Sequence, residues 1–392
     1  MHIGIFGRRN VGKSSVLNAL VKQQVSIVSE TPGTTTDPVE KTMEFKPLGP
    51  VVFIDTAGVD DSGALGNMRI ARTMKVIDRT ELALLVADAW SAYEKDLITL
   101  FKKKNIPCVV IANKCDLGGK GTLHTGAAAL NCRFIVNVSA TELTGFAELR
   151  EAIIRAAPEE FLDQAAPMAG IVRPDDLVVL VTPIDLEAPK GRLIVPQVQV
   201  LRDLLDHDAC ALVVKENALA GALAGLKNNP ALVITDSQAF KKVAEIVPEK
   251  IPLTSFSIIY ARFKGDLAEM VSGAKAIAKL ADGDKILIAE ACSHHPVEDD
   301  IGRVKLPKWL KEFTKRDLKI KVCAGRDFPE DLSSYKLVIH CGGCVFNRRE
   351  LLARIEKAKK ARVPITNYGL AIAFLAGIFN RAIKPFKKEL AL

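Results

Sequence analysis

The stretch "GRRNVGKSS", residues 7–15, constrains the fold more than any other part of the sequence. Its spacing fits G-x-x-x-x-G-K-[ST], and it lies between an apolar strand-like run, "HIGIF", and a helical pattern. A glycine-rich turn in this place lets backbone N–H groups surround phosphate oxygens, and the helix N-terminus adds positive potential. The sequence therefore predicts a phosphate-binding loop formed by Gly7, Asn10, Val11, Gly12, Lys13, Ser14 and Ser15.

Apolar runs alternate with helical patterns along most of the chain. In the first part these runs are "HIGIF", "VVFIDTAG", "LALLVAD", "CVVIANK" and "RFIVNVSA". This alternation predicts an α/β fold with mostly parallel sheets. A stretch rich in Ala and Pro, residues 156–170, indicates a linker, and the alternation then restarts twice. We expect three domains: a P-loop domain at 1–160, a small α/β domain at 171–262 and a third α/β domain at 263–392.

Further motifs supply the groups that act on a bound triphosphate. Lys13 can reach the β- and γ-phosphates, and the Ser14 hydroxyl can coordinate Mg²⁺. In "VVFIDTAG", Asp55 is placed to hold Mg²⁺ through water, and the N–H of Gly58 can sense the γ-phosphate. In "TPGTTTDP", Thr35 is expected to complete the Mg²⁺ shell, with Thr34 as the nearby alternative.

The motif "NKCD" predicts which base is bound. It supplies Asn113, Lys114 and Asp116 after an apolar strand. A carboxylate there can accept both N1–H and the exocyclic amine of guanine, and adenine has no such pair of donors. Ser139 and Ala140, in "VSA", fit a loop that closes over the base. The first domain is therefore predicted to bind and hydrolyse GTP with Mg²⁺.

Four of these motifs, "GRRNVGKSS", "GTTTD", "DTAG" and "NKCD", together resemble the TrmE–Era class of GTPases. In potassium-activated members of that class, a P-loop Asn helps to hold K⁺ near the phosphates, and Asn10 occupies that position. Val59 stands where Ras-like proteins carry a Gln that orients water. The resemblance therefore implies slow hydrolysis that K⁺ stimulates.

Composition narrows the class of protein. No apolar stretch is long enough to span a membrane, and no signal-like segment precedes the first strand, so we expect a cytoplasmic protein. The net charge is +8, and residues 264–392 hold 25 Lys and Arg against 16 Asp and Glu. The positive excess of the C-terminal part is consistent with an anionic ligand or with a solvated surface.

Thiols and imidazoles gather at two strand ends in the third domain. Cys292 and His294 follow "KILIAEA", and His340, Cys341 and Cys344 follow "KLVI". In a parallel sheet these ends share one edge, so residues far apart in sequence can converge there. Buried thiols, a redox C-x-x-C pair and a structural zinc site compete with an iron–sulfur cluster held by three cysteines. Such a cluster leaves a fourth position open to His294, His340, Glu298 or Asp299.

The pattern C-x-H, then H-C-x-x-C, joined to an N-terminal GTPase, resembles the HydF family of FeFe-hydrogenase maturation GTPases. The stretches "APKGRLIVPQ", "EDDIGRVKLPKWL" and "TNYG" fit the same family. The resemblance implies a homodimeric scaffold, with domain 171–262 as the dimerisation domain, that carries a 4Fe–4S cluster and a di-iron precursor of the H-cluster. It implies as partners apo FeFe-hydrogenase and the radical-SAM maturases that build the precursor.

The resemblance also implies cluster ligands. They are Cys292, Cys341 and Cys344, with Asp299 favoured as an exchangeable fourth ligand and Glu298 next. His294 and His340 rank behind these residues. The alternative function is an RNA- or ribosome-associated GTPase with a structural zinc domain. Against it, the chain lacks a basic motif interleaved with aromatic residues, and its aromatic content is only 6%, so nucleic acid is not expected as a partner. A membrane is not expected either, because no apolar stretch is long enough to span one.

Overall fold

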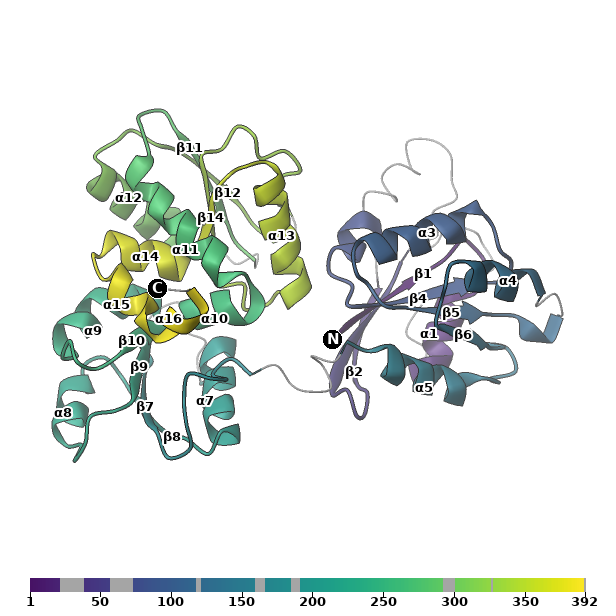
Figure 1. The fold of residues 1–392 in the computed structure, drawn as a ribbon, viewed down its shortest axis with the longest axis horizontal. Helices are drawn as coiled ribbons and strands as arrows, with labels where there is room; N and C mark the ends of the chain where they lie inside the picture. Colours follow the sequence, from purple (N-terminus) through teal and green to yellow (C-terminus); the bar gives the residue numbers. More distant parts are fainter. Residues whose placement is uncertain are drawn as a thin grey trace. The chain divides into compact units, whose positions relative to one another are not determined.

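The computed structural model describes residues 1–21, 39–56, 73–117, 121–158, 166–184, 191–291, 300–325 and 327–390. The chain divides into two compact units, Met1–Gln164 and Ala165–Leu392 (Figure 1). Three sheets lie in these units, one in the first and two in the second. The α/β class and the predominance of parallel strands are confirmed.

The first unit is built on a six-stranded sheet in the order β2-β3-β1-β4-β5-β6. Its strands are β1 (His2–Phe6), β2 (Val39–Glu44), β3 (Pro50–Asp55), β4 (Leu82–Ala87), β5 (Cys108–Ala112) and β6 (Phe134–Asn137). Only β2 runs antiparallel to its neighbour. The sequence did not lead us to expect β2, because its polar composition, "VEKTME", gives a weak strand signal.

Helices cover both faces of this sheet. They are α1 (Lys13–Val21), α3 (Ala92–Lys103), α4 (Gly121–Ala129) and α5 (Phe146–Ala156). Successive residues of β1 point to opposite faces: Ile5 packs in one buried cluster with Leu17, and Phe6 packs in the other with Phe101. A strand that is apolar at every position is therefore buried on both sides, as expected for a parallel sheet.

The second unit begins with a four-stranded parallel sheet in the order β10-β9-β7-β8. The strands are β7 (Leu177–Val181), β8 (Cys210–Val214), β9 (Leu232–Thr235) and β10 (Leu253–Ser255). The connecting helices are α7 (Val195–Asp206), α8 (Leu219–Ala224) and α9 (Phe240–Ile246), and α10 (Phe256–Lys264) follows β10. Helix α7 begins at Val195, within "APKGRLIVPQ", and carries Pro196 in its first turn.

The second sheet of this unit has the order β12-β11-β13-β14, with all strands parallel. Its strands are β11 (Lys285–Ala289), β12 (Lys319–Cys323), β13 (Leu337–His340) and β14 (Ile365–Asn367). Its helices are α11 (Leu267–Lys275), α12 (Leu306–Thr314), α13 (Arg348–Lys360), α14 (Tyr368–Leu375), α15 (Phe379–Ile383) and α16 (Lys387–Leu390). In Figure 1, α12 and α13 flank the sheet on opposite sides.

This strand order creates a topological switch point. From β11 the chain passes to β12 on one side, and after β13 it passes to β14 on the other. The chain therefore continues in opposite directions along the sheet after β11 and after β13, and doubly wound sheets bind ligands at the carboxyl ends of strands that flank such a point. The predicted thiol loops begin at these two strand ends.

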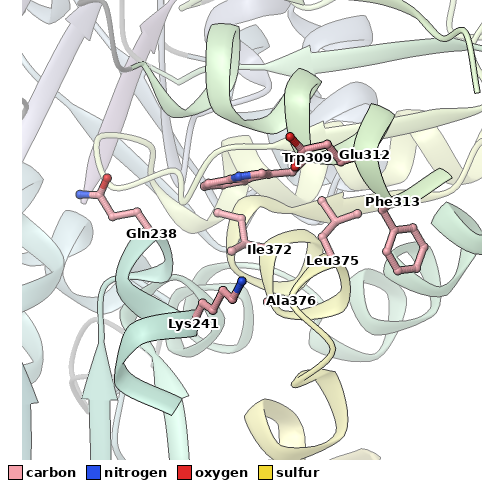
Figure 2. Close-up of a pocket in the computed structure, with 8 residues that line it drawn as sticks. All are labelled: Gln238, Lys241, Trp309, Glu312, Phe313, Ile372, Leu375 and Ala376. Carbon is pink, nitrogen blue, oxygen red and sulfur yellow. The ribbon is translucent and has the colours of Figure 1, made fainter. Parts of the chain in front are cut away.

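The two sheets of the second unit share one hydrophobic core. It runs from Val179 and Phe240 to Leu287 and Ile339. A cavity of about 380 Å³ is lined by residues of α9, α12 and α14, with Lys241 on one side and Trp309, Phe313 and Leu375 on the other (Figure 2). The division of residues 171–392 into two separate domains stays a prediction. In the described residues, no helix is long and apolar enough to cross a bilayer.

Candidate nucleotide and cluster sites

The phosphate loop leaves β1 and enters α1 as predicted. Gly7 and Gly12 have φ values of +149° and +92°, where a side chain would be strained. A Cβ on Gly7 would lie 2.2 Å from the carbonyl oxygen of Val86, and one on Gly12 would lie 2.3 Å from Nδ2 of Asn113. Only glycine therefore allows the loop to pack against the strand and the base-recognition segment at once.

The lysine and the two groups predicted to bind Mg²⁺ converge at this loop. Lys13 is 8% exposed, and its ammonium donates to the carbonyl oxygens of Gly7 at 3.0 Å and Arg8 at 2.8 Å. The Ser14 hydroxyl donates to Oδ2 of Asp55 at 2.5 Å. Asp55 stands at the end of β3, beside β1 in the sheet. Two oxygen donors for Mg²⁺ thus meet although they are far apart in sequence.

Asn113 connects the base-recognition segment to the phosphate loop. Its Nδ2 donates to the carbonyl oxygen of Val11 at 2.8 Å, and its Oδ1 accepts from the N–H of Ala140 at 3.2 Å. Ser139 is fully buried, and its hydroxyl accepts from the N–H of Glu142 at 3.1 Å. The segments predicted to hold phosphate and base are therefore in direct contact.

Lys114 and Asp116 follow Asn113 at the surface. Lys114 has a φ of +58°, and its ammonium lies 2.8 Å from Oδ2 of Asp88. Asp116 lies in a short 3₁₀ turn, Cys115–Leu117, where it is exposed to an incoming base. Ser15 is half-buried on the first turn of α1, and Asn10 is exposed in the loop with a φ of +61°.

Sequence reasoning missed the role of Arg8. Its Nε donates to the fully buried carboxylate of Glu94 at 2.8 Å, and its Nη2 lies 3.3 Å from Oδ1 of Asp88. Glu94 also accepts from the N–H of Ser91 at the start of α3. Arg8 thus ties the phosphate loop to α3. The available signal was a pair of basic residues, Arg8 and Arg9, directly after the first glycine of the motif.

Several predicted site residues lie outside the described residues. In the first unit they are Thr35, its alternative Thr34, Gly58 and Val59. In the second unit they are Cys292, His294, Glu298 and Asp299. Their proposed roles stay predictions.

The two thiol loops start side by side. Ala289 at the end of β11 pairs with His340 at the end of β13, and the N–H of Cys341 donates to the carbonyl oxygen of Ala289 at 2.8 Å. The Cys341 sulfur then accepts from the N–H of Ala291 at 3.0 Å and of Gly343 at 3.5 Å. Ala291 directly precedes Cys292 in the chain, so the residue that leads into the first thiol loop contacts Cys341.

The turn that carries Cys344 is held from α10. Gly343 has a φ of +63°, which lets the backbone turn between the two cysteines. The Lys264 ammonium donates to the carbonyl oxygens of Cys344 at 3.0 Å and Phe346 at 2.7 Å. Asn347 then caps α13 by accepting from the N–H of Glu350 at 2.9 Å.

His340 is fully buried and its ring nitrogens both have partners. Nδ1 lies 2.8 Å from the carbonyl oxygen of Cys341, and Nε2 lies 3.1 Å from Nη1 of Arg354. A carbonyl only accepts and a guanidinium only donates, so the ring is the neutral Nδ1–H tautomer. Burial and then the Arg354 charge lower the pKa of His340 to about 3. In this arrangement His340 has no lone pair left for a metal ion.

Cys323 also lies at this edge of the sheet. It ends β12, and Ala289 of β11 pairs with it in the sheet. Burial raises the pKa of its thiol. Its strand, β12, lies on the opposite side of β11 from β13, which leads to Cys341.

The side chains near the two cysteine loops show how far the described residues could hold a metal centre. They contain no group of three His, Cys, Asp or Glu side chains placed to hold a metal ion, and Cys292, His294 and Asp299 lie outside them. The donor chemistry nevertheless fits a thiolate-bound cluster, because Cys341 accepts backbone N–H groups, which favour the anionic sulfur.

The fold and the site define a P-loop GTPase domain followed by two α/β segments. Residues 2–114 match the domain family described as 50S ribosome-binding GTPase. Residues 168–265 match the hydrogen maturase F dimerization domain, and residues 268–385 match the hydrogen maturase F tetramerization domain. The chain belongs to the hydrogen maturase F (HydF) family.

Two curated relatives match part of this chain. The tRNA modification GTPase MnmE of Aquifex aeolicus is 36% identical over 155 residues, which cover 39% of this chain and 34% of that protein. GTPase Der of Sulfurimonas denitrificans is 35% identical over 124 residues, 30% of this chain and 25% of that protein. The chain therefore spans about a third or less of the length of these relatives.

Among solved structures, Aquifex aeolicus Era bound to GDP.AlF4- aligns with a TM-score of 0.36 and 20% identity. The alignment covers 55% of this chain and 93% of that one. A likeness of this size has no bearing on function.

Proposed function

We propose that this protein is a GTP-hydrolysing scaffold that binds a 4Fe–4S cluster and a di-iron precursor and delivers the precursor to apo FeFe-hydrogenase. The observation that carries the proposal is the combination of a P-loop GTPase domain with both hydrogen maturase F domains in one chain. The contact of Cys341 with the end of β11 supports it, because that end leads directly to Cys292. Cys292, Cys341 and Cys344 are the proposed ligands, with Asp299 as the exchangeable fourth.

In this proposal GTP acts on conformation rather than on the cluster. Binding and hydrolysis alter the switch segments and thereby the contacts with partners, which include the radical-SAM maturases. Dimerisation through residues 171–262 and further self-association through residues 263–392 are part of the proposal, supported by the two matched domain descriptions. GTP hydrolysis is slow and stimulated by K⁺, with Asn10 among the K⁺ ligands. Equal hydrolysis rates in Na⁺ and K⁺ salts would refute the K⁺ site.

Two variants test the separation of the two chemistries. Lys13→Ala is expected to abolish GTP hydrolysis and to leave intact the absorbance of the iron–sulfur cluster, at about 400 nm. Cys344→Ser is expected to lose the cluster absorbance and to keep GTP hydrolysis. Loss of both properties in either variant would contradict independent sites. Activation of purified apo-hydrogenase by the loaded wild-type protein tests delivery directly.

A second candidate is an RNA- or ribosome-associated GTPase with a structural zinc site. The description of the domain matched by residues 2–114 and the tRNA modification activity named for MnmE favour it. Anaerobic reconstitution separates the two, since a cluster protein is brown and a zinc protein is colourless. Zinc without sulfide, together with retention on ribosomal subunits, would establish the second function.

A further inference from the structure

We propose that Arg354 is a fixed positive charge of the cluster site, which offsets the negative charge of thiolates and cluster bound at the Cys341–Cys344 turn. This inference rests on the proposed cluster function and deepens it. Arg354 is a positioning residue here and not a ligand.

The guanidinium of Arg354 is enclosed by protein. The residue extends from α13 and is only 5% exposed. Its guanidinium carbon lies 4.3 Å from the ring centre of Phe346 and 4.8 Å from that of Phe328. Aromatic faces attract a cation but carry no net charge, so they stabilise the guanidinium without neutralising it.

The polar partners of Arg354 are neutral as well. Nη1 donates to Nε2 of His340 at 3.1 Å, and Nη2 donates to the carbonyl oxygen of Gly325 at 2.5 Å. Within the described ranges no carboxylate lies at ion-pair distance from it, and Glu350, one turn earlier on α13, acts on it only through space. A buried charge without a counter-ion is costly, so buried guanidinium groups normally have an anionic partner.

The Cys341–Cys344 turn is the part of the proposed site that hydrogen bonds link to Arg354, and a thiolate or cluster there would supply that anion. The His340 ring links Arg354 to the site, because its Nδ1–H is bonded to the carbonyl oxygen of Cys341. The cation therefore lies behind the turn, at a position set by two hydrogen bonds and two aromatic rings. A cluster held by three thiolates carries net negative charge, and a fixed cation beside it stabilises the reduced state relative to the oxidised state.

The test compares wild type with Arg354→Met, Arg354→Lys and the control Arg362→Met, whose side chain is exposed just after α13. Each protein is loaded anaerobically with iron and sulfide, and the midpoint potential is measured by EPR-monitored redox titration. We expect Arg354→Met to shift the midpoint to more negative values. Arg354→Lys should keep most of the wild-type potential, and Arg362→Met all of it.

A second measurement separates this role from a purely structural one. Loading should raise the Tm of wild type more than that of Arg354→Met, because the cluster relieves an uncompensated cation only in wild type. An equal fall in Tm in the metal-free and loaded forms would show a structural residue and overturn the inference. If Arg354→Met does not fold, Arg354→Gln carries the same comparison.

The outcomes separate a failure of the proposed cluster function from a failure of the role of Arg354. Wild type that retains no iron and sulfide would overturn the proposed function, and this inference with it. Wild type that loads normally, with an unchanged midpoint in the variants that lack the positive charge, would overturn the role of Arg354 alone.

Discussion

The side-chain amide of Asn113 donates to the carbonyl oxygen of Val11 at 2.8 Å, so the residue expected to frame guanine also braces the phosphate loop. This contact joins two motifs that lie about a hundred residues apart in the chain. It makes the loop geometry depend on a residue that would otherwise be assigned to base recognition alone.

We predict that Asn113→Ala weakens GDP binding by about 10- to 100-fold, because one buried and one partly buried hydrogen bond are lost. Asn113→Asp removes only one of these two hydrogen bonds, since a carboxylate can still accept from the N–H of Ala140 but cannot donate to the carbonyl oxygen of Val11. Titration with a fluorescent GDP analogue measures the GDP affinity of both variants. Wild-type affinity in Asn113→Asp would show that the brace to Val11 contributes nothing.

The Ser14–Asp55 contact predicts the site of Mg²⁺. Removal of the hydroxyl in Ser14→Ala should lower the rate of phosphate release at saturating GTP by about 100-fold, because the ion that balances the developing charge loses a ligand. The exposed Thr99, whose hydroxyl bonds only its own helix at the carbonyl oxygen of Lys95, supplies the control Thr99→Ala. Equal Mg²⁺ dependence in wild type and Ser14→Ala would argue against this assignment.

Lys264 is predicted to hold the cysteine turn in shape. In Lys264→Met the carbonyl oxygens of Cys344 and Phe346 lose their donor, so the loaded protein should release iron to a chelator about tenfold faster. Lys275→Met, at an exposed position of α11, should leave the rate unchanged. Identical rates for the two variants would mean that the turn is rigid without Lys264.

Gly273 sets the approach of α11 to β14. A Cβ there would lie 1.9 Å from the carbonyl oxygen of Ile365, so Gly273→Ala must push the helix off the sheet. We expect a loss of about 3 kcal/mol in the free energy of unfolding. Gly221→Ala, in α8 with open space around it, should instead stabilise slightly, by about 0.5 kcal/mol. Thermal unfolding followed by circular dichroism compares them; equal Tm values would contradict the close packing.

Much of the architecture could be predicted because local patterns are strong here. Every apolar run named in the sequence became a strand, and "APKGRLIVPQ" leads into a helix. The exception, β2, is half polar and owes its place to pairing with β3. The nucleotide residues were predictable for a similar reason, because the fixed spacing of a P-loop encodes its own geometry.

What the sequence by itself determined is the α/β class, the order of the strands along the chain and the chemical types gathered at their ends. Only the tertiary structure decided that β11 and β13 are neighbours, that His340 uses both ring nitrogens within the protein, and that Arg354 lies buried behind Cys341. The physical reason is the distance along the chain over which each kind of interaction acts. Periodicity and spacing act between residues close in the chain, whereas burial and hydrogen-bond partners arise only when distant segments pack together.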